Sequence, residues 1–100
     1  MRENEKIIID VEKLFPEAAR RVKILEDLQK SWAGVVGIAL ARNSFPEVLG
    51  VDGIKIFAAN QKTLSMLSNM KGNITRALKK RYDYDINSDF EVKIQLTHQH

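Results

Sequence analysis

The sequence contains no cysteine, only two prolines and two histidines, and no apolar run long enough to cross a bilayer. The lack of cysteine excludes disulfides, thiolate catalysis and cysteine-ligated zinc or iron–sulfur sites. The longest apolar run, Val35 to Ala41, is interrupted by a glycine and is far shorter than the roughly 20 residues of a membrane span. The first ten residues lack the basic and then apolar layout of a signal peptide. We therefore expect a cytoplasmic protein with one domain over residues 1–100.

Residues that could support catalysis or metal binding are also scarce. The two histidines, His98 and His100, end the chain, where residues 97–100 are expected to fray. An H-x-H pair could chelate a metal, but no carboxylate pattern accompanies it. The sequence has no nucleophile signature, Walker-type loop or dinucleotide fingerprint. We predict that the protein is not an enzyme and uses no metal or cofactor.

Apolar residues recur at helical spacing in the first part of the chain, which predicts helices there. Residues 1–16 are expected to form an N-terminal helical segment, with a helix over Glu5 to Phe15. Pro16 suits the first turn of the next helix. That helix is predicted over Glu17 to Arg42 from one apolar stripe: Val22, Leu25, Leu28, Trp32, Val35, Val36 and Ala39. After Trp32 every side of this predicted helix is apolar, so we expect this part of the helix to be buried on more than one side. The bare G-x-x-G pattern of Gly34 to Gly37 matches the loop of KH domains, but two central valines favour close helix packing instead.

The second half of the chain predicts a hairpin, a helix and a final strand. Asp52-Gly53 between two β-rich runs indicates a type I′ turn. A helix is predicted over Gln61 to Tyr82 with Asn60 as its N-cap, and with a kink or a snorkelling lysine near Lys71. The segment from Phe90 to Leu96 alternates without interruption, with Phe90, Val92, Ile94 and Leu96 inward.

The predicted order is α-α-β-β-α-β. It places the protein in the α+β class, with a three-stranded sheet and helices packed on one face of that sheet. A full helix separates the final strand from the hairpin, so this strand can pair in parallel with a hairpin strand.

Positive charge is concentrated in the predicted third helix. The chain has a net charge of +3, yet Asn60 to Tyr82 contains six cations and no acid. On a helical wheel, Lys62, Arg76 and Lys80 share a sector opposite the apolar residues Leu67 and Ile74. Lys79 flanks this stripe, and Arg81 lies in the last turn. We predict that Lys62, Arg76, Lys79, Lys80 and Arg81 bind nucleic-acid phosphates; alternatively, the cations only complement the helix dipole or form a solvated face.

The aromatic residues divide into two groups. Trp32, Phe45, Phe57 and Phe90 are predicted to belong to the core. Tyr82 and Tyr84 follow the run Lys79-Lys80-Arg81, and aromatics beside cations suit nucleic acid. Alternatively, Tyr82 packs at the end of the helix and Tyr84 lies in a surface loop, without contact to nucleic acid, and we favour this interpretation.

The middle of the chain resembles the N-terminal domain of the DciA family, bacterial partners and loaders of the replicative DNA helicase. The matching pattern is Leu28-x-x-x-Trp32-x-x-Val35-Val36-Gly37-x-x-Leu40-Ala41-x-x-Ser44-x-Pro46, then Leu49-Gly50-Val51-Asp52-Gly53-Ile54-Lys55-Ile56, then a helix from Leu64-x-x-Leu67 to Leu78 and the closing strand. The resemblance implies a KH-like fold, DNA binding and contact with the helicase. We therefore expect a monomeric, nucleic-acid-binding accessory protein of DNA replication, of unresolved strand preference. The alternative is a protein–protein adaptor without nucleic-acid contact.

Overall fold

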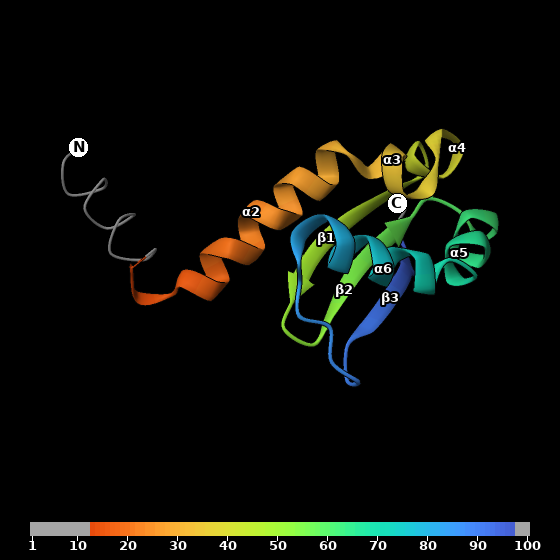
Figure 1. Ribbon diagram of the computed structural model, residues 1–100. Coiled ribbons are helices and arrows are strands. Elements are labelled where there is room, and N and C mark those ends of the chain that lie inside the picture. Colours follow the sequence, from red (N-terminus) through yellow and green to blue (C-terminus); the bar gives the residue numbers. More distant parts are fainter. Residues whose placement is uncertain (1–12, 98–100) are drawn as a thin grey trace, which may run out of the picture.

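A three-stranded sheet with helices on one face forms the body of the molecule. The computed structural model describes residues 13–97 (Figure 1). Its elements are α2 (Pro16–Lys30), α3 (Trp32–Val36), α4 (Ile38–Ala41), β1 (Ser44–Gly50), β2 (Gly53–Ala58), α5 (Gln61–Ser68), α6 (Lys71–Tyr82) and β3 (Glu91–Leu96). The predicted α+β class and the predicted sheet are confirmed.

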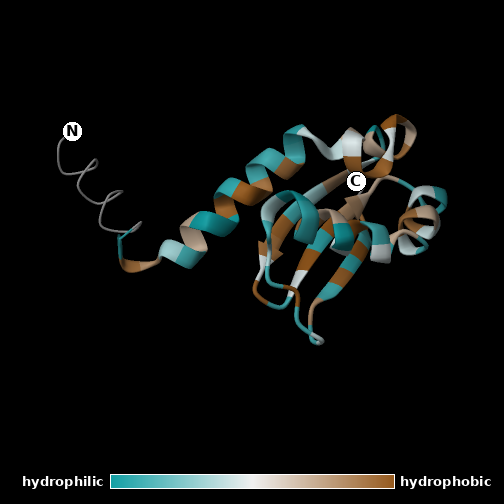
Figure 2. Cartoon of the chain, in the orientation of Figure 1, coloured by the Kyte–Doolittle hydropathy of each residue, from teal (hydrophilic) through white to brown (hydrophobic). Residues whose placement is uncertain are grey.

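The sheet has the order β1-β2-β3 and is mixed. Strand β1 pairs antiparallel with β2, and β2 pairs parallel with β3, a pairing that the long helical connection permits. Figure 2 shows apolar and polar residues alternating along β3, the pattern of a strand whose two sides face different surroundings. In β3 this alternation buries Val92, whereas Leu96, predicted to point inward, is 44% exposed at the end of the strand.

The core lies between the sheet and the helices. Its strand residues are Leu49 of β1, Ile54, Ile56 and Ala58 of β2, and Val92 of β3. Its helix residues are Ile24 and Leu28 of α2, Trp32 and Val36 of α3, Leu40 of α4, Leu67 of α5, and Ile74 and Leu78 of α6. Trp32 is only 3% exposed, and its indole Nε1 donates a hydrogen bond to Ser44 Oγ at 2.8 Å. The prediction that Trp32 is a core residue is confirmed.

The long helix predicted over Glu17 to Arg42 is wrong, because the chain forms three helices there. The first break is at Ser31, and the second is at Gly37, whose φ of 93° is a conformation that favours glycine. The prediction of burial on several sides after Trp32 also fails, since Ile38 is 66% exposed. Val22 is exposed as well, because the N-terminal half of α2 projects past the sheet (Figure 1).

The turn between β1 and β2 differs from the predicted one. Gly50 pairs with Gly53, so the connecting residues are Val51 and Asp52, and Gly53 is the first residue of β2. Neither connecting residue has a positive φ, which a type I′ turn requires at both positions. Gly53 serves a different purpose: a Cβ there would lie 2.5 Å from the Glu91 backbone oxygen. This glycine therefore allows β3 to approach β2 closely.

The predicted third helix is divided into α5 and α6 by a break at Asn69 and Met70. The break confirms the kink expected near Lys71, and it places Lys71 at the exposed start of α6 rather than in the apolar stripe. The N-cap prediction is also confirmed, because the Asn60 side chain accepts a hydrogen bond from the Thr63 amide at 2.8 Å.

Two predictions concern segments outside residues 13–97. The predicted helix from Glu5 to Phe15 lies mostly before the described part of the chain, and the predicted frayed end lies mostly after it. Of the helices described, none is long and apolar enough to cross a membrane.

Candidate nucleic-acid interface

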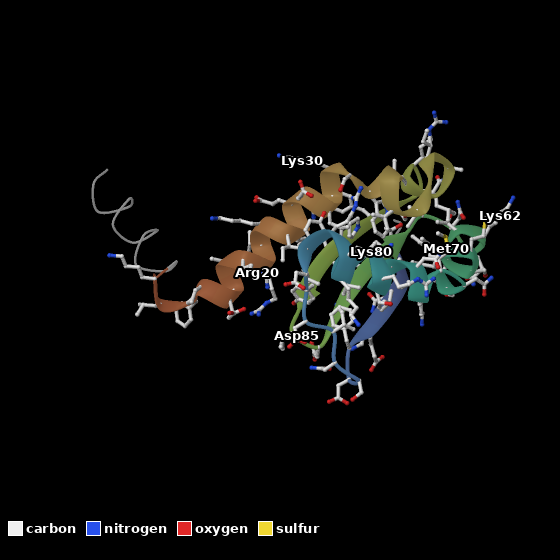
Figure 3. All side chains as sticks on the ribbon, viewed as in Figure 1. Arg20, Lys30, Lys62, Met70, Lys80 and Asp85 are labelled. Atoms are coloured by element: carbon white, nitrogen blue, oxygen red, sulfur yellow. The ribbon has the colours of Figure 1, made fainter. Side chains whose placement is uncertain are left out.

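The five predicted phosphate-binding residues lie on two helices rather than one. Lys62 is in the first turn of α5, and the other four, Arg76, Lys79, Lys80 and Arg81, are on α6; all five are exposed. Figure 3 shows Lys62 and Lys80 on separate helices, with Met70 between them along the chain. The single continuous stripe that the wheel predicted is therefore wrong, and Lys62 is separated from Arg76 and Lys80.

The outer side of α6 keeps three of the predicted residues together. Ile74 and Leu78 are fully buried and fix which side of this helix faces the sheet. With 100° between successive residues, Arg76 lies directly opposite them, and Lys79 and Lys80 flank Arg76. We refer to Arg76, Lys79 and Lys80 as the α6 cationic face. The Arg76 guanidinium also donates a hydrogen bond to the Asn73 side chain, which holds it along the helix surface.

Arg81 has a structural contact that the sequence did not predict. Its Nη1 donates to Ser31 Oγ at 2.9 Å, so it joins the end of α6 to the junction of α2 and α3. Its other terminal nitrogen lies 3.2 Å from the point that a Cβ of Gly34 would occupy. The close-packing interpretation is thus confirmed for Gly34, whereas Gly37 is required for its backbone conformation.

Side chains of α2 make hydrogen bonds to the C-terminal end of α6. Arg20 Nη2 donates to the Tyr82 carbonyl oxygen at 2.7 Å, and the Tyr82 hydroxyl donates to Asp27 Oδ2 at 2.7 Å. Burial raises the pKa of Tyr82, and the hydrogen bond to the Asp27 carboxylate acts in the same direction. The predicted helix-end contact of Tyr82 is confirmed. Arg20 of α2 therefore donates a hydrogen bond to a terminal carbonyl group of α6. Lysines in the last turn of a helix can make such a bond, but here a residue of another helix makes it.

Tyr84 is buried, so the prediction of a surface loop is wrong for this residue. Its hydroxyl donates to the Gly50 carbonyl oxygen at 2.9 Å, and its ring meets Phe90 edge-on with centroids 6.0 Å apart. Burial raises its pKa too. A ring held in this way is not available to stack on a base.

Lys71 is the cation that the wheel misplaced. A wheel drawn through an unbroken helix turned it toward the core, but the break at Asn69 and Met70 leaves it exposed in the first turn of α6. The neighbouring Gly72 in the sequence was the available signal, since glycine weakens a helix interior. Residues 61–82 contain no Asp or Glu, so no carboxylate on α5 or α6 competes for these cations.

The chemistry available here is the binding of anions. Within residues 13–97, no group of three or more His, Asp or Glu side chains could hold a metal ion. Guanidinium and ammonium groups on an exposed helix instead bind phosphate oxygens without reading base sequence. Comparisons of the chain with protein-family models, curated proteins and solved structures find no match.

Proposed function

We propose that the protein binds nucleic acid through the α6 cationic face, as an accessory protein of DNA replication that contacts the replicative helicase. The observation that carries the binding proposal is the outward side of α6. Arg76, Lys79 and Lys80 project there, opposite Ile74 and Leu78, on a helix without carboxylates.

The fold has little need for these three cations at their positions. Arg20 of α2 bonds a terminal carbonyl of α6, and Arg81 provides the contact to the α2–α3 junction. Exposed charges of this kind contribute little to stability. A cluster of one sign that the fold does not require is typical of a surface for a polyanion.

The role in replication rests on the resemblance to the DciA family. The described elements follow the order of helices, hairpin, helices and final strand that the resemblance implies, with α2, α3 and α4 in place of one long helix before the hairpin and α5 and α6 in place of one helix after it. This order supports the fold part of the resemblance. Contact with the helicase is carried over from the family alone, so it is tested separately from nucleic-acid binding.

The decisive variant is Arg76→Glu/Lys80→Glu. Binding to single- and double-stranded oligonucleotides is measured by fluorescence anisotropy over a range of salt. Each lost phosphate contact should lower the log–log salt slope by about 0.9 on duplex and about 0.7 on single strands. We expect binding to vanish at moderate salt, with folding unchanged by circular dichroism.

A matched control separates local contact from overall charge. Lys13→Glu/Lys23→Glu replaces two exposed lysines that are not among the predicted phosphate-binding residues, and both double variants change the net charge from +3 to −1. The control should keep most of the affinity. Equal losses in the two variants would refute a specific role for α6. If the α6 variant binds oligonucleotides normally but loses the helicase in a pull-down, the face is a protein interface and the adaptor alternative is correct.

A further inference from the structure

The face of the sheet opposite the helices carries a second set of aromatic and basic residues. The helices cover one face, where Leu49, Ile54 and Val92 are buried (Figure 1). The side chains that alternate with these point to the other face, which no described element covers. The prediction that Phe45 belongs to the core is wrong, because it is 47% exposed there, and Phe57 is also partly exposed. We call this surface the open face of the sheet; its residues are Phe45, Val48, Lys55, Phe57, Lys93 and Gln95.

The strand register places these residues in two rows across the sheet. In the first row, Phe45 of β1 lies directly opposite Phe57 of β2. In the second row, Lys55 of β2 lies directly beside Lys93 of β3. Neighbouring strands are about 4.8 Å apart, and the two rows are separated by two strand residues, about 7 Å. A pair of aromatic rings therefore adjoins a pair of ammonium groups.

A shallow hollow lies beside the two rings. It has a volume of about 230 Å³ and is lined by Phe45 and Phe57 together with Arg42, Asn43, Ser44, Ala59 and Thr97. The rings thus have a cation on each side: Arg42 at the hollow, and the lysine row farther along the strands. Carboxylates also lie near this surface. Glu47 is exposed at the irregularity of β1 between Pro46 and Val48, and Glu26 of α2 lines a second hollow together with Lys30 and Phe45. On β3, Glu91 is four residues from Gln95, the partner of Phe57, or about 13 Å along the strand.

The energetics of this surface favour an anionic ligand with flat apolar faces. Like charges side by side on adjacent strands repel each other, so Lys55 and Lys93 are stabilised by a bound anion. Exposed aromatic rings gain most from a partner that covers their faces. A purely apolar protein partner would cover the rings but would also desolvate both lysines without pairing them.

We infer that the open face of the sheet binds single-stranded nucleic acid, with bases stacked on Phe45 and Phe57 and phosphates on Lys55, Lys93 and Arg42. Unpaired bases expose the π-faces that such rings recognise, whereas a duplex hides them within its own stack. This inference deepens the proposed function by adding strand selectivity on the side of the sheet away from α6. It shares the ligand class of the α6 cationic face but depends on different residues.

Three probes of equal length test the stacking contact on the full chain. They are a deoxythymidine oligonucleotide, the same phosphodiester without bases, and a duplex. The wild type should bind deoxythymidine more tightly than the abasic strand at one salt concentration. Phe45→Ala and Phe57→Ala should each weaken deoxythymidine binding by about 5- to 150-fold, the range for a base stacked on one ring, and should leave abasic and duplex binding unchanged. Met66→Ala removes an exposed apolar side chain of α5, outside this face; it is the matched control and should change affinity less than about twofold.

A second measurement avoids any effect of substitution on folding. In an NMR titration of wild-type protein with deoxythymidine, backbone amides of β1, β2 and β3 should shift, and the Phe45 and Phe57 ring signals should move with them. Shifts confined to α6, or phenylalanine variants with wild-type affinity, would overturn the inference and leave the proposed function standing. If the wild-type protein binds none of the oligonucleotides, both this inference and the proposed function are refuted. Shifts of the same strand amides on raising protein concentration alone would assign the face to a second copy of the chain and refute the inference.

Discussion

Replacing Gly53 by alanine should separate two reasons for a glycine at the start of β2. The first reason is a turn that requires positive φ, and the second is the close approach of β3. The backbone conformation excludes the first reason. The second is direct: a Cβ at Gly53 would lie 2.5 Å from the carbonyl oxygen of Glu91, and the neighbouring Glu91 amide donates to the Asp52 carbonyl at 3.0 Å.

The expected cost follows from this geometry. The clash is with backbone, which cannot rotate away as a side chain can, so β2 and β3 must separate locally. Overpacking of this kind costs about 1–3 kcal/mol. For a domain of this size, each kcal/mol lowers Tm by roughly 4–8 °C. Gly50→Ala is the matched control, because Gly50 pairs with Gly53 but its added Cβ would meet only ordinary contacts, 3.4 Å from Asp52 Oδ1 and 3.7 Å from the Gly53 carbonyl oxygen. Gly50→Ala should be neutral or stabilising by up to about 1 kcal/mol.

Asparagine at position 53 provides the sharper discrimination. Asn adopts positive φ more readily than other residues with side chains, so a turn requirement would tolerate Gly53→Asn better than Gly53→Ala. A steric requirement makes the two variants equally harmful. Thermal and urea unfolding of both variants measures the difference. A Gly53→Asn protein as stable as wild type would refute the close-approach explanation.

Three further outcomes are expected. Trp32→Phe removes the indole donor and leaves a void, so it should destabilise by about 1–3 kcal/mol without altering oligonucleotide affinity; lost affinity at unchanged Tm would contradict a core role. The pKa values of Tyr82 and Tyr84 are raised in the folded protein, so folding favours the neutral form of each phenol. The free energy of unfolding should therefore be constant below about pH 10 with respect to these groups and should fall above it. Urea unfolding at pH 9 and pH 11 should show a smaller fall for Tyr84→Phe than for the wild type. Arg81→Gln should lower Tm by a few degrees because it removes an interhelix hydrogen bond, whereas Lys79→Gln should lower only affinity and the salt slope; the opposite pattern would reverse their roles.

Sequence patterns predicted the features that depend on local periodicity. The uninterrupted alternation of residues 90–96 indicated β3, and its distance from the hairpin allowed the parallel pairing that the structure has. Asn60 was recognisable as a cap because its side chain serves the adjacent helix only. The breaks at Ser31 and Gly37 were not predicted, because a wheel assumes one continuous axis. The break at Asn69 and Met70 was predicted as a kink near Lys71, because Gly72 weakens the helix there.

The orientation of β2 shows a second limit of periodicity. Ile54 and Ile56 alternate with Lys55 and Phe57, so both sides of this strand carry apolar residues. A period of two identifies a strand, but it does not say which side the helices will cover when both contain large apolar groups. Phe57 and its cross-strand partner Phe45 were therefore assigned to the core, and the open face of the sheet went unrecognised.

The run Lys79-Lys80-Arg81 shows why charge density alone could not define the candidate site. Successive residues of a helix are 100° apart, so three adjacent cations cannot share one direction. On α6 the two lysines face away from Ile74 and Leu78, while Arg81 turns toward the α2–α3 junction and bonds to Ser31. In the sequence the three residues form one basic cluster. In the structure they divide into two cations presented outward and one that joins helices, and only the first two are expected to change the salt dependence of nucleic-acid binding.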